Sequence, residues 1–391
     1  METKQLIGTF EEIFTTADPR VFFAPGRINL IGEHTDYNGG NVFPCAITYG
    51  TYAIAKKRSD QKIRMYSSNF PHTGVIDVEM DRLDYNAAHD WANYPKGMVK
   101  FLNQRHQSID SGFDVLFYGN IPNGAGLSSS ASIELVTGVL LENLFNLEID
   151  RIDLVKLGQQ VENQYIGVNS GIMDQFAIGM GKKDHGILLD CTTLEYEYAP
   201  LELEDYKIII MNTNKQRTLA TSKYNERRNE CEKALVYLQQ ELDVLSLGAI
   251  TEQTFEGNKN LIEDEVTMRR ARHAVTENAR TEKALHALKD GRLNEFGKLM
   301  NLSHISLRDD YEVTGLELDT LVEAAWEQEG TLGARMTGAG FGGCAIAIVE
   351  EDKIDEFIRS VGDKYLESTG LEATFYIASI GDGAKEIKVG G

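Results

Sequence analysis

Basic side chains are scarce in this sequence. Lys and Arg number 39 against 60 Asp and Glu among 391 residues, so the formal net charge is −21 at pH 7. Phosphate backbones and anionic lipid surfaces would repel such a chain, and we expect no nucleic-acid partner and no membrane partner. An anionic ligand would have to be bound by local features, namely backbone N–H groups, a few cations and a metal ion.

Long apolar runs, a secretory signal and paired cysteines are also lacking. No apolar run approaches the roughly 18 residues of a membrane span, and the opening METKQLIGTFEEIF lacks the basic and then apolar pattern of a signal peptide. The four cysteines are scattered without C-x-x-C spacing, which is typical of free thiols in a reducing compartment. The eight histidines form no cluster with metal-ligand spacing. We therefore expect a cytoplasmic protein.

The hydrophobic pattern predicts helices and strands in two groups. Residues 20–80 alternate as strands do, and helical spacing follows at about residues 93–106, 130–146 and 151–166. A second group opens near residue 205 with the strand YKIIIMNTN and closes with the strand ATFYIASI. Between these strands we expect helices at about residues 217–243, 262–289, 315–329 and 352–367. A chain of this length has room for two domains, so we predict an α+β fold with domains at residues 1–205 and 206–391, although no linker marks the boundary.

Residues 26–40, GRINLIGEHTDYNGG, carry an unusual density of polar side chains. Arg27, Glu33, His34 and Asp36 lie within this stretch among short apolar runs. A partly buried pocket of this kind can bind a sugar, because each sugar hydroxyl both donates and accepts hydrogen bonds. The residue types alone would fit a charged surface turn equally well.

Residues 122–134, PNGAGLSSSASIE, lie between a predicted strand and a predicted helix. Gly124 and Gly126 allow the backbone to turn tightly and to approach a ligand, and the serines at 128–130 offer hydroxyls where the helix begins. The free N–H groups and the positive end of the helix dipole would form a phosphate site there. An ordinary turn with a serine cap is the alternative.

Residues 333–349, GARMTGAGFGGCAIAIV, satisfy the pattern G-x-G-x-x-G at Gly338, Gly340 and Gly343. These glycines precede a strand, whereas a dinucleotide site needs them after a strand and at the opening of a helix, so we reject that interpretation. A loop that packs against another site loop or against bound phosphate fits better. The lysine-bearing phosphate loop G-x-x-x-x-G-K-[ST] is absent from the chain.

In this order the three segments resemble the motifs of the GHMP kinases, and GRINLIGEHTDYNGG is similar to the signature of one family within them, the galactokinases. The resemblance runs from about residue 20 to the C-terminal strands. It implies a ribosomal-protein-S5-like N-terminal domain and a ferredoxin-like C-terminal domain. The active site would lie in the cleft between them, and the last strand would return to the N-terminal domain.

The activity that the resemblance implies is ATP-dependent phosphorylation of α-D-galactose at the anomeric oxygen, which yields α-D-galactose 1-phosphate and ADP. The implied cofactor is Mg²⁺, with ATP as co-substrate, and the implied enzyme is a monomer that binds galactose and Mg–ATP. Two alternatives share these motifs: an N-acetylgalactosamine kinase, which needs room beside the C2 hydroxyl, and a catalytically silent galactose and ATP sensor that acts on transcription. The intact serine run and Asp174 argue against a silent protein.

The resemblance also implies roles for individual side chains. Asp174, in VNSGIMDQFAIGMG, is the implied base that takes or orients the proton of the anomeric hydroxyl, although its surroundings alone would favour a turn residue or a helix cap. Arg27 would stabilise that carboxylate and offset charge on the transferring phosphoryl group. Ser130 and Glu162 are the implied magnesium ligands.

The remaining implied contacts fall into three sets. The sugar contacts are Glu33, His34, Thr35, Asp36, Gly171 and Tyr224. Asp36 is the best candidate partner for the C4 hydroxyl, whose orientation distinguishes galactose from glucose. Ser67 and Trp91 are implied near the adenine, although Trp91 could equally be a core residue. The phosphate contacts are Gly124, Ala125, Gly126, Leu127, Ser128, Ser129 and Ser130.

Overall fold

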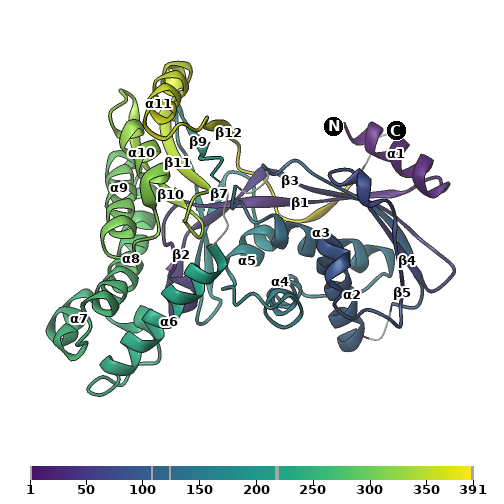
Figure 1. Cartoon of the computed structure of the whole chain (residues 1–391), viewed down its shortest axis with the longest axis horizontal. Helices are drawn as coiled ribbons and strands as arrows, with labels where there is room; N and C mark the ends of the chain where they lie inside the picture. The colour runs from purple at the N-terminus through teal and green to yellow at the C-terminus, as the bar shows by residue number, and fades with distance from the viewer. Residues whose placement is uncertain (1, 107–108, 123–124, 216–219, 389–391) are drawn as a thin grey trace.

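The computed structural model describes residues 2–106, 109–122, 125–215 and 220–388. The molecule is elongated and has two halves, each built on a sheet that is packed with helices (Figure 1). Helices and strands occur in both halves, which confirms the predicted α+β class.

The first half contains a six-stranded sheet with the strand order β13-β1-β3-β6-β4-β5. Its strands are β1 (Arg20–Asn29), β3 (Pro44–Lys57), β4 (Lys62–Ser67), β5 (Ile76–Glu79), β6 (Phe113–Gly119) and β13 (Lys385–Ile387). Neighbouring strands are antiparallel except for β4 and β6. A separate three-stranded sheet consists of β2 (Asn41–Val42), β7 (His185–Asp190) and β8 (Tyr196–Pro200).

Helices pack on both faces of the six-stranded sheet, because successive side chains of a strand point to opposite faces. Along β1, Val21 packs in a small cluster with α1 (Thr3–Phe14), whereas Phe22 belongs to the larger core on the opposite face. The helices of that core are α2 (Asn93–His106), α3 (Ser129–Leu144), α4 (Arg151–Gln160) and α5 (Met173–Met180).

The second half contains a four-stranded antiparallel sheet with the order β10-β11-β9-β12. Its strands are β9 (Tyr206–Asn212), β10 (Thr331–Thr337), β11 (Cys344–Glu350) and β12 (Thr374–Ala378). Its helices are α6 (Ala220–Leu238), α7 (Glu252–Asn258), α8 (Glu265–Lys289), α9 (Leu293–Asp309), α10 (Gly315–Trp326) and α11 (Ile354–Thr369). With helices between β9 and β10 and α11 between β11 and β12, the succession is the β-α-β-β-α-β of a ferredoxin-like domain.

Short helical turns connect these elements. Six are 3₁₀ turns among the described residues: η1 (Asp36–Asn38), η2 (Pro71–Thr73), η3 (Ala87–Ala92), η5 (Leu247–Ala249), η6 (Lys259–Leu261) and η7 (Glu351–Lys353). The turn η4 (Val161–Ile166) is π-helical and continues α4 directly.

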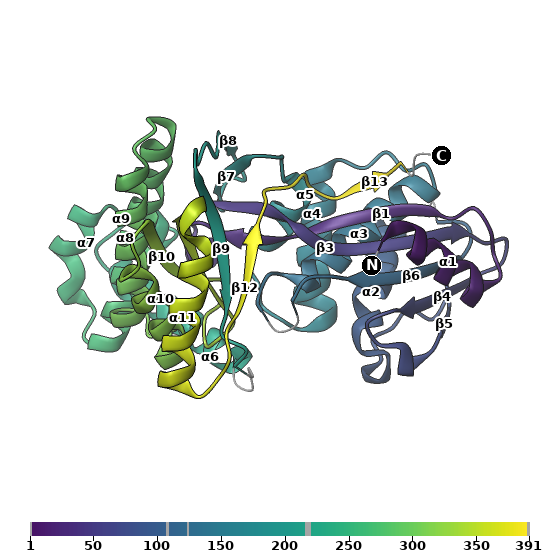
Figure 2. The same ribbon diagram turned by 90° about the horizontal axis from the view of Figure 1, so that it is seen from above.

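One apolar cluster joins the two halves. Ile208 and Ile210 of β9 pack in the same cluster as Ile28 and Leu30 of the first half, together with residues of α8 and α9. Ile209 points to the opposite face and packs in the core of the second half. Seen from above, β9 and β12 lie beside the end of the long strands β1 and β3 (Figure 2). The residues that follow β1, which carry the opening motif, are therefore buried between the halves.

The structure differs from the predicted elements in several places. The sequence did not predict helices α1, α5, α7 and α9 or strands β2, β10 and β13. The expected helix at residues 151–166 changes from α to π geometry at Val161. The expected final strand ATFYIASI is β12 and stays in the second sheet, while the three-residue β13 is the strand that pairs with β1. A strand so short has too little alternation to be detected from sequence. The division at residues 205 and 206 falls between β8 and β9 and stays a prediction.

Candidate active site

Two adjoining cavities share Ser130, the second residue of α3. The first, which we call the polar cavity, has a volume of about 330 Å³, and the second, the aromatic cavity, has about 260 Å³. The polar cavity is lined by Arg27, Glu33, His34, Asp36, Ser130, Glu162, Val168, Ser170, Gly171, Met173, Asp174, Tyr224, Gly338 and Ala339. The aromatic cavity is lined by Thr51, Ser67, Asn69, Phe70, Asp90, Trp91, Tyr94, Phe117, Gly119, Ile121, Ser129, Ser130 and Ile133.

Asp174 lies in the first turn of α5 and is held by two partners. The Arg27 guanidinium forms a bidentate pair with the carboxylate, in which Nε donates to Oδ1 at 2.9 Å and Nη2 donates to Oδ2 at 3.1 Å. The remaining nitrogen, Nη1, donates to the Gly126 carbonyl at 2.8 Å. The Ser128 hydroxyl donates to Oδ2 at 2.5 Å. Arg27 is buried, but the Asp174 side chain remains 29% exposed, so one edge of an oriented carboxylate faces the polar cavity.

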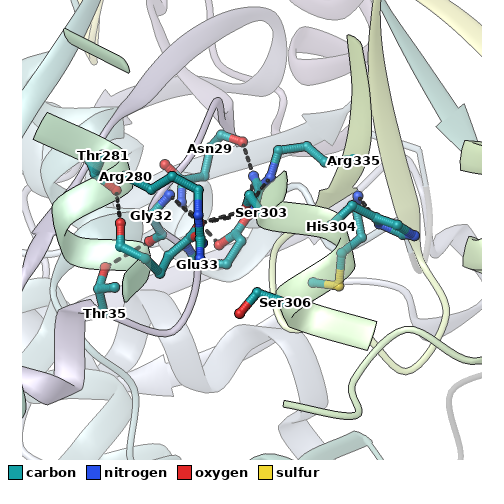
Figure 3. Close-up of polar contacts among 12 residues, drawn as sticks. Asn29, Gly32, Glu33, Thr35, Arg280, Thr281, Ser303, His304, Ser306 and Arg335 are labelled. Carbon is teal, nitrogen blue, oxygen red and sulfur yellow. Dashed lines mark hydrogen bonds and ion pairs between the residues drawn. The ribbon is translucent and has the colours of Figure 1, made fainter. Parts of the chain in front are cut away.

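Glu33 is anchored in a buried polar network that links the two halves (Figure 3). Its Oε2 accepts from the Asn29 amide at 3.0 Å, and its Oε1 accepts from the Gly338 backbone N–H at 2.6 Å. Arg335 lies 3.4 Å from Oε1 and is itself fully buried. Burial raises the pKa of Glu33, and the Arg335 charge acts against that rise.

Two further residues of the opening motif line the polar cavity. His34 has its Nδ1 2.8 Å from the Tyr37 hydroxyl, and burial lowers the pKa of its imidazole to about 3. For Asp36, burial and the nearby Asp174 carboxylate raise the pKa to about 7. Gly171 packs against this carboxylate so closely that a Cβ would lie 1.7 Å from Asp36 Oδ2, hence only glycine fits there. The Tyr224 ring lies 5.6 Å from the His34 ring and completes this wall.

Thr35 differs in its surroundings from the other predicted sugar contacts. Its hydroxyl donates to the backbone carbonyls of Gly32 and Asn41 at 2.8 and 2.6 Å, and the residue has no exposed surface. Thr35 does not line the polar cavity. Its side chain therefore stabilises the shape of the motif, and its role as a sugar contact stays a prediction.

The predicted phosphate contacts before α3 lie in different surroundings, and their role stays a prediction. Ala125 and Leu127 are buried in the apolar cluster between the halves, and the Leu127 carbonyl accepts from the Arg27 backbone N–H. Ser128 adopts a left-handed backbone with φ 62° and donates to Asp174 instead of facing a cavity. Ser129 and Ser130, which are also predicted phosphate contacts, line the aromatic cavity. The predicted contact Gly124 lies outside the described residues.

Glu162 and Ser130 meet at the polar cavity. Burial raises the pKa of Glu162, and hydrogen bonds from Ser170 and Ser130 act against that rise. Behind it lies Glu134, fully buried on α3, which accepts from the Gln175 amide at 3.1 Å and whose pKa burial raises well above its ordinary value. The predicted pair is thus close enough to share a hydrogen bond, within a group of carboxyl side chains.

Ser67 and Trp91, the two predicted adenine contacts, both line the aromatic cavity. The Trp91 ring packs edge-on against Phe117, with the ring centres 5.7 Å apart. Its indole N–H is buried and has no hydrogen-bond partner among the residues that the structure describes. Tyr94 and Ile133 supply further flat or apolar surface suited to a planar base.

Three family models match this chain. The galactokinase galactose-binding signature matches residues 8–57, the GHMP kinases N terminal domain residues 93–182, and the GHMP kinases C terminal domain residues 284–367. A galactokinase of Fusobacterium nucleatum is 61% identical over 387 residues, which cover 98% of this chain and 100% of that protein. One of Exiguobacterium sibiricum is 63% identical over 388 residues, or 99% of both chains. The chain belongs to the galactokinase family.

Solved structures agree with this assignment. The crystal structure of Lactococcus lactis galactokinase complexed with galactose superposes with a TM-score of 0.96 at 55% identity, over 98% of this chain and 99% of that one. Mevalonate kinase of Methanococcus jannaschii matches with a TM-score of 0.65 at 20% identity over 94% of this chain, which shows the shared fold. The predicted GHMP kinase fold, with its N-terminal and C-terminal domains, is thereby confirmed.

Several residues around the site of this galactokinase family member were not predicted. Arg335, Glu277 and Asn29 support Glu33, and Gln175 supports Glu134. The available signal was weak: Arg335 is a lone charge in the otherwise small and apolar segment GARMTGAG. A single charged residue is most often exposed, so its burial beside Glu33 could not be inferred from composition.

The oxygen donors at Ser130 and Glu162 fit a magnesium ion, because Mg²⁺ prefers oxygen ligands and takes few from the protein. No group of three or more His, Cys, Asp or Glu side chains arranged to hold a metal occurs in the described ranges. A site of one hydroxyl and one carboxylate therefore suits an ion that is held largely by phosphates and water. No described helix combines the length and apolar character that a bilayer crossing requires.

Proposed function

We propose that this chain is a galactokinase that transfers the γ-phosphoryl group of ATP to the anomeric oxygen of α-D-galactose. The observation that carries this proposal is the Arg27–Asp174 pair, which lies in a polar cavity that adjoins an aromatic cavity through Ser130. A sugar in the first cavity and an adenine in the second would bring the phosphates to the start of α3. Phosphoryl transfer depends mainly on such positioning and on electrostatic stabilisation.

The residues of the proposed site have three separate roles. Asp174 would accept or orient the proton of the anomeric hydroxyl, while Arg27 holds the carboxylate by two hydrogen bonds and would offset charge on the transferring group. Glu33, His34, Asp36 and Tyr224 would bind the other hydroxyls. Mg²⁺ bound at Ser130 and Glu162 would neutralise charge on the phosphates. The monomeric state and the cytoplasmic location stay predictions.

An ADP-release assay tests the function. The purified chain with Mg–ATP should release ADP with galactose, and the product should be phosphorylated at the anomeric oxygen. The same assay is repeated with N-acetylgalactosamine, glucose, homoserine or mevalonate in place of galactose. Turnover of N-acetylgalactosamine at a comparable rate would favour the kinase of that sugar, whereas binding of galactose and ATP without turnover would favour the silent sensor.

Asp36→Asn should make the enzyme more stable but less active. The folded protein raises the Asp36 pKa to about 7 from its ordinary 3.8, so the folded state binds this proton more tightly than the unfolded state. Asp36 therefore costs stability progressively as pH rises from about 4 to about 7, and an amide removes this cost. We expect melting temperatures of the variant and wild type to coincide at low pH and the variant to melt higher above neutrality. Galactose kcat/KM should fall by about 10- to 100-fold, since a hydrogen bond to a charged group is lost.

Asp60→Asn is the matched control. Asp60 pairs with Arg58 in the turn between β3 and β4, lines neither cavity, and has its pKa lowered by that hydrogen bond. Its replacement should shift stability in the opposite direction above pH 4 and leave galactose kinetics unchanged. Equal galactose kinetics for Asp36→Asn and wild type would remove Asp36 from the sugar site.

Ser130→Ala and Glu162→Ala should each raise the Mg²⁺ concentration that gives half-maximal activity by about tenfold or more, because each removes an oxygen ligand. Titration of activity with Mg²⁺ at fixed ATP measures this change. Glu142→Gln, on the same helix as Ser130 but paired with Arg151 outside both cavities, should titrate as wild type does. Wild-type titration curves for both site variants would exclude these residues as ligands.

A further inference from the structure

A chain of hydrogen bonds leads from the polar cavity into the second half of the molecule. His34 Nδ1 lies 2.8 Å from the Tyr37 hydroxyl, which lies 2.7 Å from the Tyr311 hydroxyl. The Tyr311 hydroxyl lies 3.1 Å from the Cys231 thiol. Tyr311 and Cys231 are fully buried, and of the four residues only His34 lines the cavity.

The His34 end of this chain has one ring nitrogen left for a ligand. Nδ1 is taken by Tyr37, whereas Nε2 is buried and has no hydrogen-bond partner of good geometry in the part of the chain that the structure describes. The Ala339 backbone, which lines the same cavity, interacts with the ring and acts against the lowering of its pKa. The residue itself is held firmly, since its backbone is left-handed with φ 62° and its carbonyl accepts from the Asn38 amide at 2.7 Å. A buried polar atom without a partner costs free energy unless a ligand supplies one.

The chemistry of the four groups decides the direction of the chain. A neutral imidazole carries one N–H and one lone pair, and its lone pair is a better acceptor than a phenol oxygen or a thiol sulfur. Tyr37 therefore donates to His34 Nδ1, Tyr311 donates to Tyr37, and the Cys231 thiol donates to Tyr311. The opposite direction would end on sulfur, which is a weak acceptor. Burial keeps the imidazole neutral by lowering its pKa to about 3.

We propose that Tyr37 and Tyr311 are positioning residues that hold His34 in the tautomer with its proton on Nε2, so that His34 donates a hydrogen bond to a hydroxyl oxygen of the sugar. This rests on the proposed function for the identity of the ligand as galactose. The tautomer itself is a property of the unliganded protein. The opening motif and the second half thus cooperate in sugar recognition through residues that never contact the sugar.

Nitrogen NMR of the unliganded protein tests the tautomer directly. With ¹⁵N-histidine labelling, long-range proton–nitrogen spectra at neutral pH should show His34 with an unprotonated Nδ1 and a protonated Nε2, assigned by the loss of its signals in His34→Gln. Tyr37→Phe and Tyr311→Phe should shift these nitrogens towards a mixture of tautomers. Tyr365→Phe is the matched control, because Tyr365 is also fully buried and donates to the Thr213 carbonyl at 2.8 Å, away from both cavities.

Kinetics with deoxygenated sugars test the hydrogen bond from His34 to the sugar. Tyr37→Phe should raise the galactose KM by about tenfold, the scale of one hydrogen bond, with the ATP KM unchanged. The monodeoxygalactose that lacks the hydroxyl bound by His34 should bind wild type more weakly than galactose does. Tyr37→Phe should bind this sugar and galactose with similar affinity, since the bond from His34 is already weakened. A role in packing alone would penalise all the sugars alike.

Either of two results would overturn the proposal: a wild-type His34 protonated on Nδ1, or an unchanged tautomer in both tyrosine variants. A wild-type protein with the expected tautomer but no galactose turnover would instead refute the proposed function. If Tyr37→Phe does not fold, Tyr311→Phe and the wild-type spectrum still decide the matter.

Discussion

Replacing Asp174 with asparagine should lower kcat by about 10²-fold or more, the scale of a lost general base, while galactose and ATP should still bind. The amide keeps the shape of the side chain but has one acceptor oxygen instead of two. In the structure both carboxylate oxygens are used, one by Arg27 alone and the other by Arg27 and Ser128. Single-turnover kinetics and equilibrium binding separate the loss of chemistry from any loss of substrate affinity.

Two further variants serve as a comparison and a control for Asp174→Asn. Ser128→Ala removes the 2.5 Å hydrogen bond but leaves the carboxylate, so its effect on kcat should be smaller than that of Asp174→Asn. Asp150→Asn makes the same chemical change at the N-cap of α4, outside both cavities, and should leave catalysis unchanged. A near wild-type kcat for Asp174→Asn would show that another group takes the proton.

Arg335→Met should destabilise the folded protein by about 3–5 kcal/mol, the cost of leaving a buried charge without its partner. Arg335 donates to the Ser303 hydroxyl and the Asn29 carbonyl at 3.1 and 3.0 Å (Figure 3). It also neutralises Glu33 at 3.4 Å and Glu277 at 3.8 Å. Methionine fills similar space but supplies neither charge nor donors. Urea unfolding followed by circular dichroism measures the loss.

Arg308→Met is the control for an ordinary ion pair. Arg308 is paired with Asp309 and Glu323 at the surface, where such pairs contribute up to about 1 kcal/mol. The double variant Arg335→Met with Glu33→Gln should recover part of the stability loss, because the Glu33 carboxylate is the buried charge that Arg335→Met would otherwise leave without its ion pair. If Arg335→Met loses no more stability than Arg308→Met, the buried network does not hold the halves together.

The opening motif illustrates what sequence reasoning could predict. Arg27, Glu33, His34 and Asp36 lie within one short segment, and the structure brings all four to the same cavity. The reason is local: the segment leaves β1 and turns at η1, so neighbouring residues cannot separate far in space. The order of the three motifs likewise indicated the family that the comparisons then confirmed.

The hydrogen-bond partners of individual side chains within those motifs were less predictable. Thr35 and Ser128 have hydroxyls suited to ligands, yet one bonds the backbone of its own loop and the other bonds Asp174. Nothing in the residue types distinguishes these partners from a sugar or a phosphate. The choice depends on which groups lie within hydrogen-bond distance once the chain is folded.

The sequence by itself determined the α+β class, the family and the segments that form the site, because hydrophobic periodicity and contiguous motifs are local properties of the chain. Only the tertiary structure decided which distant residues support that site. Arg335 reaches Glu33 from 302 positions away, and Tyr311 reaches Tyr37 from 274 positions away. These contacts exist because an apolar cluster shared by the two sheets docks the second half onto the opening motif, and that docking follows from packing across the whole molecule.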